Sequence, residues 1–407
     1  MTGLARMTGK VVLLGATGYT GARVAESLVA RGATPVLAGR SPQKLAALSD
    51  RLGGATMAVA DVADAGSVRS LVGAGDVLVS TVGPFTRFGG PAVDAAVAAG
   101  AVYLDSTGEP PFVRRVFEQH GPAAARSGAA LLTAFGNDYV PGVLAGALAV
   151  RQARSAGVPA RVDVGYFVTT ERSAGRTRIG SGGSGQPFSR GTLNSLVGVA
   201  AEPVHAWREG ELRREAAGTR MRTFDVAGRP RPGVTVGGTE QFALPRFEPG
   251  LRVVDVYLGW FGPASGAVHA GSALTPWLSR VPALGRAVTG LAGLVTGWAA
   301  ESPDAENLAR STSHFVAEVF DDAGTLLART RLVAPDAYAI TADLLAWGAT
   351  RAAEHGVHGT GALDPVGAFG LDELAAGAAS AGIVEAGAGN GPGNGSGSGA
   401  ADGPSGR

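Results

Sequence analysis

Three glycines near the start of the chain have the spacing of a loop that binds the phosphates of a dinucleotide. They lie in the segment GATGYTG, directly after the apolar run Val11–Leu14 and before a stretch of helix-forming residues. In such a loop the first glycine permits a sharp turn, the second lets the backbone approach a pyrophosphate, and the third lets the helix pack on the strand. The N–H groups at the start of the helix attract the phosphates. The residues expected to contact the dinucleotide here are Gly15, Thr17, Gly18, Tyr19, Thr20 and Gly21.

The residues after the second apolar run favour NADP over NAD. Enzymes that use NAD usually have an acidic residue there, whereas this chain has Arg40 and Ser41, with Lys44 one helical turn further. Arg40 can pair with a 2′-phosphate and Ser41 can donate a hydrogen bond to it, although Arg40 could also be a solvated loop residue. Asp61, after the third run, could accept a hydrogen bond from the adenine amino group. The path to the nicotinamide ribose is expected to be lined by Val82, Gly83 and Pro84.

Side chains that can release a proton follow the fifth and sixth apolar runs. Open α/β sheets bind ligands at the carboxyl ends of their strands, and hydride transfer to a C=C or C=N bond also needs a proton source there. A carboxylic acid with a raised pKa or a tyrosine hydroxyl could supply that proton. Asp105 and Glu109 could equally order a loop and cap a helix, and Tyr139 could instead form a wall of the pocket. The candidates for proton delivery are Asp105, Glu109, Asp138 and Tyr139.

The composition of the 407-residue chain argues against several other functions. There is no cysteine, which rules out disulfides, thiolate metal sites and cysteine nucleophiles and fits a cytoplasmic location. The net charge of +1 gives no field that would recruit nucleic acid. His355 and His358 have no third ligand type nearby, so we expect no metal site. We find no serine-hydrolase elbow at a strand-to-helix turn, and no Tyr-x-x-x-Lys pair in the first 150 residues or so.

The sequence predicts no signal peptide and no transmembrane segment. The N-terminal residues contain no apolar run that ends in a small-residue cleavage site. Ala287–Ala300 is the most apolar later stretch, but three glycines interrupt it and it is too short to span a bilayer. We expect a buried helix or loop there, with peripheral contact to a membrane as the alternative.

Short apolar runs alternate with helical stretches from Lys10 to about Arg151. Apolar runs without polar alternation are typical of strands buried on both faces, and the βαβ order predicts a parallel sheet. We therefore predict an α/β fold whose residues 9–150 form a doubly wound Rossmann domain. The predicted strands are Val11–Leu14, Pro35–Ala38, Met57–Ala60, Val77–Val82, Val102–Leu104 and Ala130–Thr133. The predicted helices are Thr20–Arg31, Pro42–Leu52, Ser67–Val72, Pro91–Ala99 and Phe112–Ser127.

The pattern changes after Arg151, where residues 151–334 are predicted to form an α+β domain with a largely antiparallel sheet. Arg161–Thr169 alternates apolar and polar residues, which predicts a strand, and Leu251–Leu258 is predicted as a further strand. Phe315–Phe320 and Thr325–Val333 flank a turn and predict a hairpin. This domain would bind substrate or form a homodimer.

The C-terminal residues are predicted in two parts. Residues 335–385 would return toward the first domain as helices, beginning with a long helix from Pro335-Asp336 to about Glu354. Residues 386–407 are rich in Gly, Ser and Asn, which cannot bury enough apolar surface to offset the entropy of ordering. We expect this tail to be disordered.

Several of these motifs together resemble the saccharopine dehydrogenase-like NADP-binding family. They are GATGYTG, LAGR, STVGPF (80–85), YLDSTGE (103–109) and a GxDxVP segment (136–141). The greatest similarity is to stand-alone actinobacterial members, which include trans-acting enoyl reductases of lipid and polyketide assembly. The family usually has Phe and Ser where this chain has Asn137 and Tyr139, while Asp138 and Pro141 match. Two later segments resemble the family as well: Arg190–Ser195 and GALDPVGAFG (361–370), with Asp364 in place of threonine.

The resemblance implies an NADPH-dependent oxidoreductase that reduces the C=C bond of an unsaturated acyl substrate, carried on CoA or a carrier protein. Because residues 137 and 139 depart from the family, two alternatives stay open. One is C=N or C–N chemistry on an imine or secondary amine, and the other is a non-catalytic NADP-binding sensor or scaffold. The loop Thr170–Pro187 contains three arginines that could close over an anionic substrate or be solvated.

Overall fold

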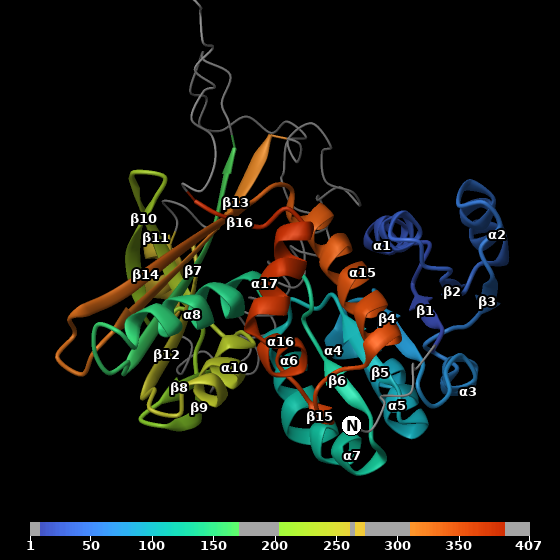
Figure 1. Cartoon of the computed structure of the whole chain (residues 1–407), viewed down its shortest axis with the longest axis horizontal. Coiled ribbons are helices and arrows are strands. Elements are labelled where there is room, and N and C mark those ends of the chain that lie inside the picture. The colour runs from blue at the N-terminus through green and yellow to red at the C-terminus, as the bar shows by residue number, and fades with distance from the viewer. Residues whose placement is uncertain (1–8, 171–202, 261–264, 273–309, 387–407) are drawn as a thin grey trace, which may run out of the picture.

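The computed structural model describes residues 9–170, 203–260, 265–272 and 310–386, which form two sheets with helices around and between them (Figure 1). The first sheet is entirely parallel, with the strand order β15-β6-β5-β4-β1-β2-β3. The order reverses between β1 and β4, which is where doubly wound sheets bind dinucleotides. The prediction of a Rossmann sheet is confirmed. Its strands are β1 (Val11–Leu14), β2 (Val36–Gly39), β3 (Met57–Val59), β4 (Val77–Ser80), β5 (Val102–Asp105), β6 (Ala130–Leu132) and β15 (Gly361–Ala362).

Helices near the predicted stretches connect these strands. They are α1 (Tyr19–Ala30), α2 (Pro42–Arg51), α3 (Ala65–Arg69), α4 (Phe85–Phe88) and α5 (Gly90–Ala99). The predicted helix Phe112–Ser127 is present, but a π-helical turn divides it. The segment contains the end of α6 (Pro110–Arg115), the π-helical turn (Val116–His120) and α7 (Gly121–Ser127). Pro122 has no backbone N–H, so a regular α-helical ladder of hydrogen bonds cannot run through this point.

The second sheet is mixed but mostly antiparallel, as predicted. Its main path is β10-β11-β12-β7-β13-β14-β16, with β8 and β9 attached to β12. Among the described strands of this second sheet, β12 and β7 form the only parallel pair. The predicted hairpin is present, with a turn in which the amide of Thr325 donates to Asp321 Oδ1 at 2.7 Å. The strands are β7 (Arg161–Thr170), β8 (Val204–Arg208), β9 (Glu211–Glu215), β10 (Met221–Val226), β11 (Arg229–Val236), β12 (Val253–Leu258), β13 (Ser311–Phe320), β14 (Leu326–Ala334) and β16 (Val384–Glu385).

Two helices that the sequence did not predict lie against this sheet. α8 (Val140–Ala153) packs on β7, β13 and β14, and α10 (Glu240–Phe247) packs on α8 and β12. α8 crosses the predicted domain boundary at residue 150. Nearly every residue of α8 is buried, so its sequence lacks the alternation of polar and apolar faces by which a surface helix is predicted.

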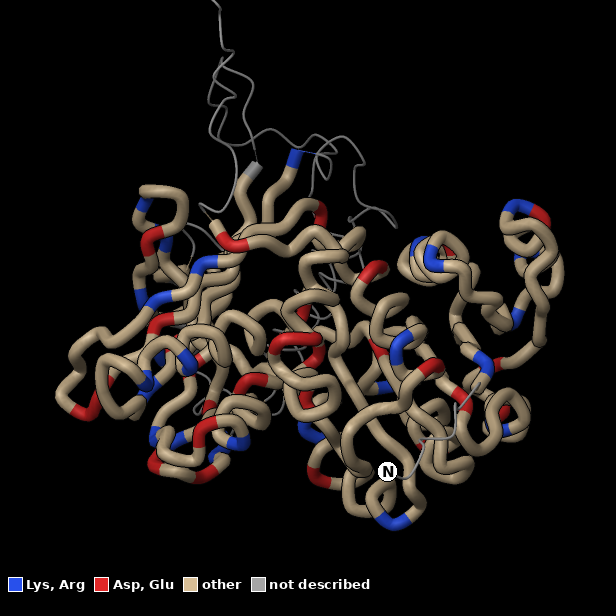
Figure 2. Tube along the Cα trace, in the orientation of Figure 1, with Lys and Arg blue, Asp and Glu red and all other residues tan. Residues whose placement is uncertain are grey.

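The C-terminal part of the described chain joins both sheets. The predicted long helix is confirmed as α15 (Ala337–His355), whose first turn is capped by Asp336 accepting from the Tyr338 amide at 2.9 Å. α15 packs on α1, β4 and β5, while β15 pairs with β6 and β16 pairs with β14. The remaining helices are α16 (Pro365–Phe369), α17 (Leu371–Ser380) and, on the second sheet, α11 (Ser265–Ser272). Basic and acidic residues are interspersed along the traced chain (Figure 2), in keeping with the small net charge.

Candidate active site

The glycine loop between β1 and α1 makes the tight turn that the motif predicts. Gly15 has a φ of +87°, and its amide and that of Ala16 donate to the carbonyl oxygen of Ala38 on β2 at 2.9 and 3.1 Å. A Cβ atom at Gly21 would overlap the carbonyl oxygen of Gly15, so the helix approaches the turn more closely than any side chain would permit. A Cβ atom at Gly15 would lie 2.9 Å from Val82 Cγ2, which places the residue after β4 against the same turn.

The N-terminus of α1 is open toward a ligand. Its cap residue is the exposed Gly18, which offers no side-chain hydrogen bond, and the first helical turn contains no acidic residue. The first N–H groups of a helix have no hydrogen-bond partners within the helix. The positive end of the α1 helix dipole is also not neutralised, because the first turn contains no acidic side chain. Thr17 and Thr20 lie beside these groups and are partly exposed. This arrangement fits the pyrophosphate of a dinucleotide.

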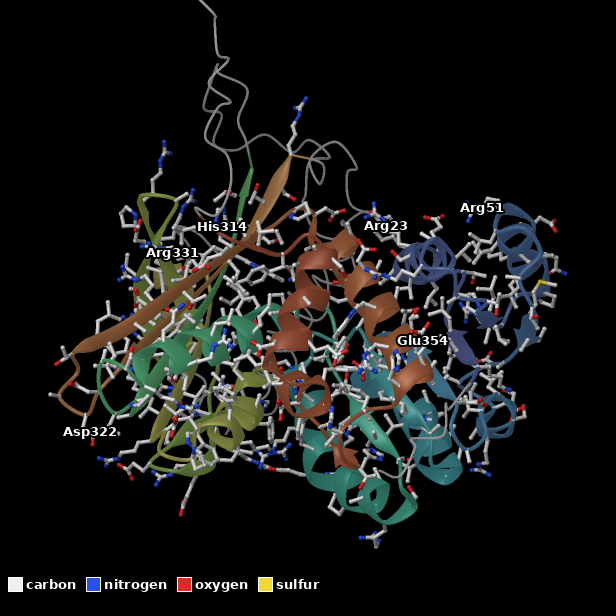
Figure 3. The ribbon with its side chains drawn as sticks, viewed as in Figure 1. Arg23, Arg51, His314, Asp322, Arg331 and Glu354 are labelled. Carbon is white, nitrogen blue, oxygen red and sulfur yellow. The ribbon has the colours of Figure 1, made fainter. Side chains whose placement is uncertain are left out.

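Tyr19 and the body of α1 are held by the C-terminal part of the chain. The Tyr19 ring makes an edge-to-face contact with Tyr338 at 5.3 Å between ring centroids. Arg23 lies 4.8 Å from the centroid of the Tyr19 ring and pairs with Asp336 at 2.6 Å (Figure 3). Burial raises the pKa of Tyr19, whose hydroxyl therefore stays neutral. Contacts between the N-terminal parts of α1 and α15 thus hold the helix that follows the glycine loop in place.

The residues predicted to select NADP lie at the end of β2. Arg40 and Lys44 are exposed, and neither forms an ion pair with another described residue. Ser41 caps α2, because its hydroxyl oxygen accepts from the Lys44 amide at 3.4 Å. A Cβ atom at Gly39 would lie 3.7 Å from Thr17 Oγ1, so this strand end adjoins the glycine loop.

Asp61 and the segment after β4 occupy neighbouring strand ends. The Asp61 carboxylate accepts from the Ala63 amide at 3.0 Å, which orders the connection to α3, and the side chain is only partly buried. Gly83 and Pro84 are exposed, and Pro84 caps α4. The structure therefore brings Val82 against the glycine turn, whereas the contacts of Asp61 are local.

Glu109 acts as the cap of α4. Its two carboxylate oxygens accept from the amides of Phe85 and Thr86 at 2.7 and 2.9 Å, and its side chain is buried. A carboxylate with both oxygens on backbone N–H groups at a helix start is well placed to hold that helix and poorly placed to give up a proton. Of the two roles considered for Glu109, the geometry favours capping.

Asp105 is enclosed at the end of β5. Its Oδ1 accepts from the amides of Thr107 and Ala134, both at 2.9 Å, and its Oδ2 accepts from the Thr133 hydroxyl at 2.8 Å. Burial raises the pKa of Asp105 to about 6 against the opposing effect of these hydrogen bonds. Because it is completely buried, the carboxyl orders the loops after β5 and β6 and offers no oxygen to a ligand.

Asp138 is the candidate acid that remains accessible. It is partly exposed, its Oδ1 accepts from Asn137 Nδ2 at 2.9 Å, and no described residue donates to its Oδ2. A Cβ atom at Gly108 would lie 2.8 Å from that Oδ2, so the carboxyl packs against the backbone of the loop after β5. Desolvation raises the pKa of Asp138 to about 6. The adjacent Tyr139 is buried, and its hydroxyl donates weakly to the carbonyl of Gly108 at 3.4 Å.

A second buried acid lies behind this loop and was missed in the sequence. Glu240, the first residue of α10, is fully buried and forms a short hydrogen bond with the Tyr166 hydroxyl of β7. His205 of β8 contacts the same region, with its Nε2 2.7 Å from the carbonyl oxygen of Gly238. The only signal for this site in the sequence is the segment GGTE (237–240), in which two glycines precede an acidic residue at a helix start.

Several predicted features lie outside the described residues. They are the arginine-containing loop after β7, the family-like segment Arg190–Ser195, the apolar stretch Ala287–Ala300 and nearly all of the C-terminal tail. Within the described ranges no helix is long and apolar enough to cross a membrane, and no group of three or more His, Asp or Glu side chains could hold a metal ion. Asp364, in the other family-like segment, caps α16 by accepting from the Gly367 amide at 2.8 Å.

Comparisons with known proteins agree with this geometry. Residues 15–104 match the model of an NAD(P)H-binding family. A putative trans-acting enoyl reductase of Mycobacterium tuberculosis is 34% identical over 229 residues, which cover 55% of this chain and 51% of the relative. A trans-acting enoyl reductase of Mycobacterium ulcerans is 38% identical over 138 residues, covering 32% of this chain and 33% of the relative. The chain thus spans about half the length or less of these curated relatives.

Among solved structures, the apo saccharopine dehydrogenase (L-Glu forming) of Saccharomyces cerevisiae superimposes with a TM-score of 0.55. The match covers 91% of this chain and 96% of the yeast enzyme at 14% sequence identity, a level that speaks to the fold alone. The resemblance predicted from the motifs is therefore confirmed: the chain has the saccharopine dehydrogenase fold, contains an NAD(P)H-binding domain and is similar in sequence to trans-acting enoyl reductases.

Proposed function

We propose that the protein is an NADPH-dependent reductase that adds hydrogen across the C=C bond of an unsaturated acyl substrate. The observation that carries the proposal is the pairing of an uncapped α1 N-terminus with a protonatable, accessible carboxyl group, Asp138, after a strand of the same parallel sheet. The first feature suits a dinucleotide and the second supplies the proton that a reduction needs. Similarity to proteins named trans-acting enoyl reductases favours the C=C bond.

The choice of NADP rests on the end of β2. A 2′-phosphate needs a positive charge and tolerates no carboxylate, and this strand end has the exposed Arg40 and Lys44. Since neither side chain is paired with another described residue, both are available to the phosphate without breaking an existing ion pair.

In the proposed reaction NADPH, held by the N-terminus of α1 and by Arg40, would supply a hydride to one carbon of the double bond. The amides at the start of α1 hold the phosphates, and Arg40 fixes the adenosine end. Asp138 transfers a proton from its carboxyl group to the other carbon, so that the C=C bond becomes a C–C single bond and NADPH becomes NADP⁺. Asp105 and Glu109 order the loops that position Asp138 and the cofactor, because their oxygens are already occupied.

The replacement of Asp138 by Asn tests this role. Asp138→Asn should leave NADPH binding unchanged and lower the rate of NADPH consumption with enoyl thioesters by about 100- to 10,000-fold, the usual contribution of a positioned acid. In the native protein the rate should fall as the pH rises through about 6, because the donor must be protonated. That dependence should be absent from the residual rate of the variant.

Asp372→Asn is a matched control, because Asp372 is highly exposed and pairs only with Arg151 on the surface. It should retain the native rate and pH profile. A cyclic imine panel measured in parallel separates C=C from C=N reduction. Full activity of Asp138→Asn on the preferred substrate would refute the assignment of the proton donor, and NADPH binding without turnover on either panel would refute the proposed reductase.

A further inference from the structure

Glu240 is a buried acidic residue with no basic side chain beside it in the described part of the chain. It is fully buried at the start of α10, and no described Lys or Arg side chain forms an ion pair with it. The backbone encloses both of its oxygens: a Cβ atom at Gly142 would overlap Oε1, and one at Gly238 would overlap Oε2. An isolated carboxylate in such a place is strongly disfavoured relative to the neutral acid.

The hydrogen bonds around Tyr166 also require a neutral Glu240. The Tyr166 hydroxyl oxygen lies 3.1 Å from the carbonyl oxygen of Tyr139 and within a short hydrogen bond of Glu240 Oε1. The hydroxyl has one hydrogen, and both neighbours would be acceptors if Glu240 were a carboxylate. If Glu240 is a carboxylic acid, its O–H donates to Tyr166, and Tyr166 donates to the Tyr139 carbonyl. Every proton then has an acceptor.

The groups that face Glu240 from neighbouring elements do not supply a compensating positive charge. Burial raises the pKa of Tyr139 and Tyr166 well above the usual value, so both stay neutral. Burial lowers the pKa of His205 to about 4, so this side chain is neutral as well. Desolvation, with a smaller contribution from the like charge of the nearby Asp138 carboxylate, raises the pKa of Glu240 to about 8.

The other charges on elements packed against α10 are engaged elsewhere. Asp255 and Tyr257 of β12 lie on the face of the sheet opposite to the one that α8 and α10 cover, where Asp255 pairs with Arg208. Arg151 of α8 pairs with Asp372. Arg246, later on α10, lies 4.0 Å from Asp364 of α16.

We propose that Glu240 is a positioning residue that is held as a neutral acid and fixes Asp138 through Tyr166 and the carbonyl group of Tyr139. When Glu240 loses its proton, the Tyr166 hydrogen turns to the new carboxylate, because a charged acceptor is the stronger one. The Tyr139 carbonyl then keeps only the amide of Val143, so the peptide group between Tyr139 and Val140, one residue beyond Asp138, loses one of its two hydrogen bonds. The inference rests on the proposed function only in taking Asp138 as the proton donor.

Infrared difference spectroscopy tests the protonation state without any substrate. The native protein near neutral pH should show the C=O band of a buried carboxylic acid that is absent from Glu240→Gln and disappears as the pH rises through about 8. In Asp138→Asn the midpoint of that loss should move to lower pH, because a neighbouring negative charge has been removed. Glu248→Gln is the matched control and should keep the band, because Glu248 lies at the opposite end of α10 and pairs with Arg154.

Activity measurements test the positioning role. NADPH consumption by the native protein should fall further as the pH rises through about 8, and Glu240→Gln should lack this step, because its amide can still donate to Tyr166 but cannot ionise. Tyr166→Phe should lower kcat several-fold at unchanged KM for NADPH. Absence of the carboxylic acid band, or the same alkaline step in Glu240→Gln, would overturn the inference. Loss of turnover on every substrate with the band and its shift in Asp138→Asn retained would instead count against the proposed function.

Discussion

Removal of the Glu109 carboxylate should weaken both the fold and the binding of NADPH. Glu109 lies on the loop after β5, but its oxygens accept from the amides of Phe85 and Thr86, directly after the segment that ends in Pro84. The side chain therefore ties the loop near Asp138 to the loop expected to line the nicotinamide ribose. In Glu109→Ala the buried amide of Phe85 and the partly buried amide of Thr86 would lose their acceptors.

The magnitude follows from the two bonds. Hydrogen bonds to charged groups contribute about 1.5–3 kcal/mol each, so Glu109→Ala should lower the free energy of unfolding by about 3–6 kcal/mol. That is a large share of the total stability of about 5–15 kcal/mol that is typical of a native protein. Glu109→Gln keeps one acceptor and turns an NH₂ group toward the other amide, so it should lose about half as much. If even 1.4 kcal/mol of the loss falls on the cofactor loop, the Kd for NADPH rises about tenfold.

Denaturant unfolding without cofactor and fluorescence titration with NADPH measure the two effects separately. Glu118→Gln is the control, because Glu118 is exposed and pairs with Arg114 one helical turn away, an interaction that contributes about 0.5 kcal/mol or less. The order expected for both readouts is Glu118→Gln near native, then Glu109→Gln, then Glu109→Ala. Native stability and native NADPH affinity in Glu109→Ala would refute the anchoring role.

Two further predictions concern the cofactor alone. Arg40→Ala should raise the Kd for NADPH by about 10- to 100-fold, as expected for the loss of a charge-assisted pair, and change the Kd for NADH by no more than about twofold. Equal losses for both nucleotides, measured by fluorescence titration, would contradict the assignment of NADP. Gly21→Ala should abolish binding of both nucleotides and lower the melting temperature, because the new methyl group would overlap the Gly15 carbonyl oxygen. Unchanged binding by Gly21→Ala would show that the turn does not hold the phosphates as proposed.

The sequence predicted the first sheet well because its signals are local. Each of the six predicted strands is a short apolar run, and the run before Gly15 and the turn after it are contiguous in the chain. The seventh strand, β15, has only two residues and no such run, so it was not predicted. The segment ELRRE of β9 has neither apolar alternation nor an apolar run, and its strand geometry comes from pairing with β8. α8 has no polar face, because its surroundings bury nearly all of it.

The same distinction separates the parts of the candidate site. The positions of Arg40 and Ser41 follow from where β2 ends, so their proximity to the glycine loop could be predicted. The hydrogen bond between Tyr166 and Glu240 joins residues 74 positions apart, and the helix that contains Glu240, α10, was not predicted. The hydrogen bond between Glu109 and Phe85 joins residues 24 positions apart. Whether a carboxyl group is a cap, a loop tether or an available acid depends on which donors the folded chain brings to it, and sequence patterns do not encode that directly.

The position of β15 late in the sequence has a consequence for folding during synthesis. The chain leaves the nucleotide-binding sheet after β6 and adds its outermost strand only at Gly361, after every described strand of the second sheet except β16. A nascent chain emerging from the ribosome therefore cannot complete the first sheet until Gly361 and Ala362 have been made, and contacts of such long range slow folding. A fragment that contains only the strands β1 to β6 and their helices would lack both β15 and α15, and α15 packs against α1. We therefore expect that this fragment does not fold as an independent domain.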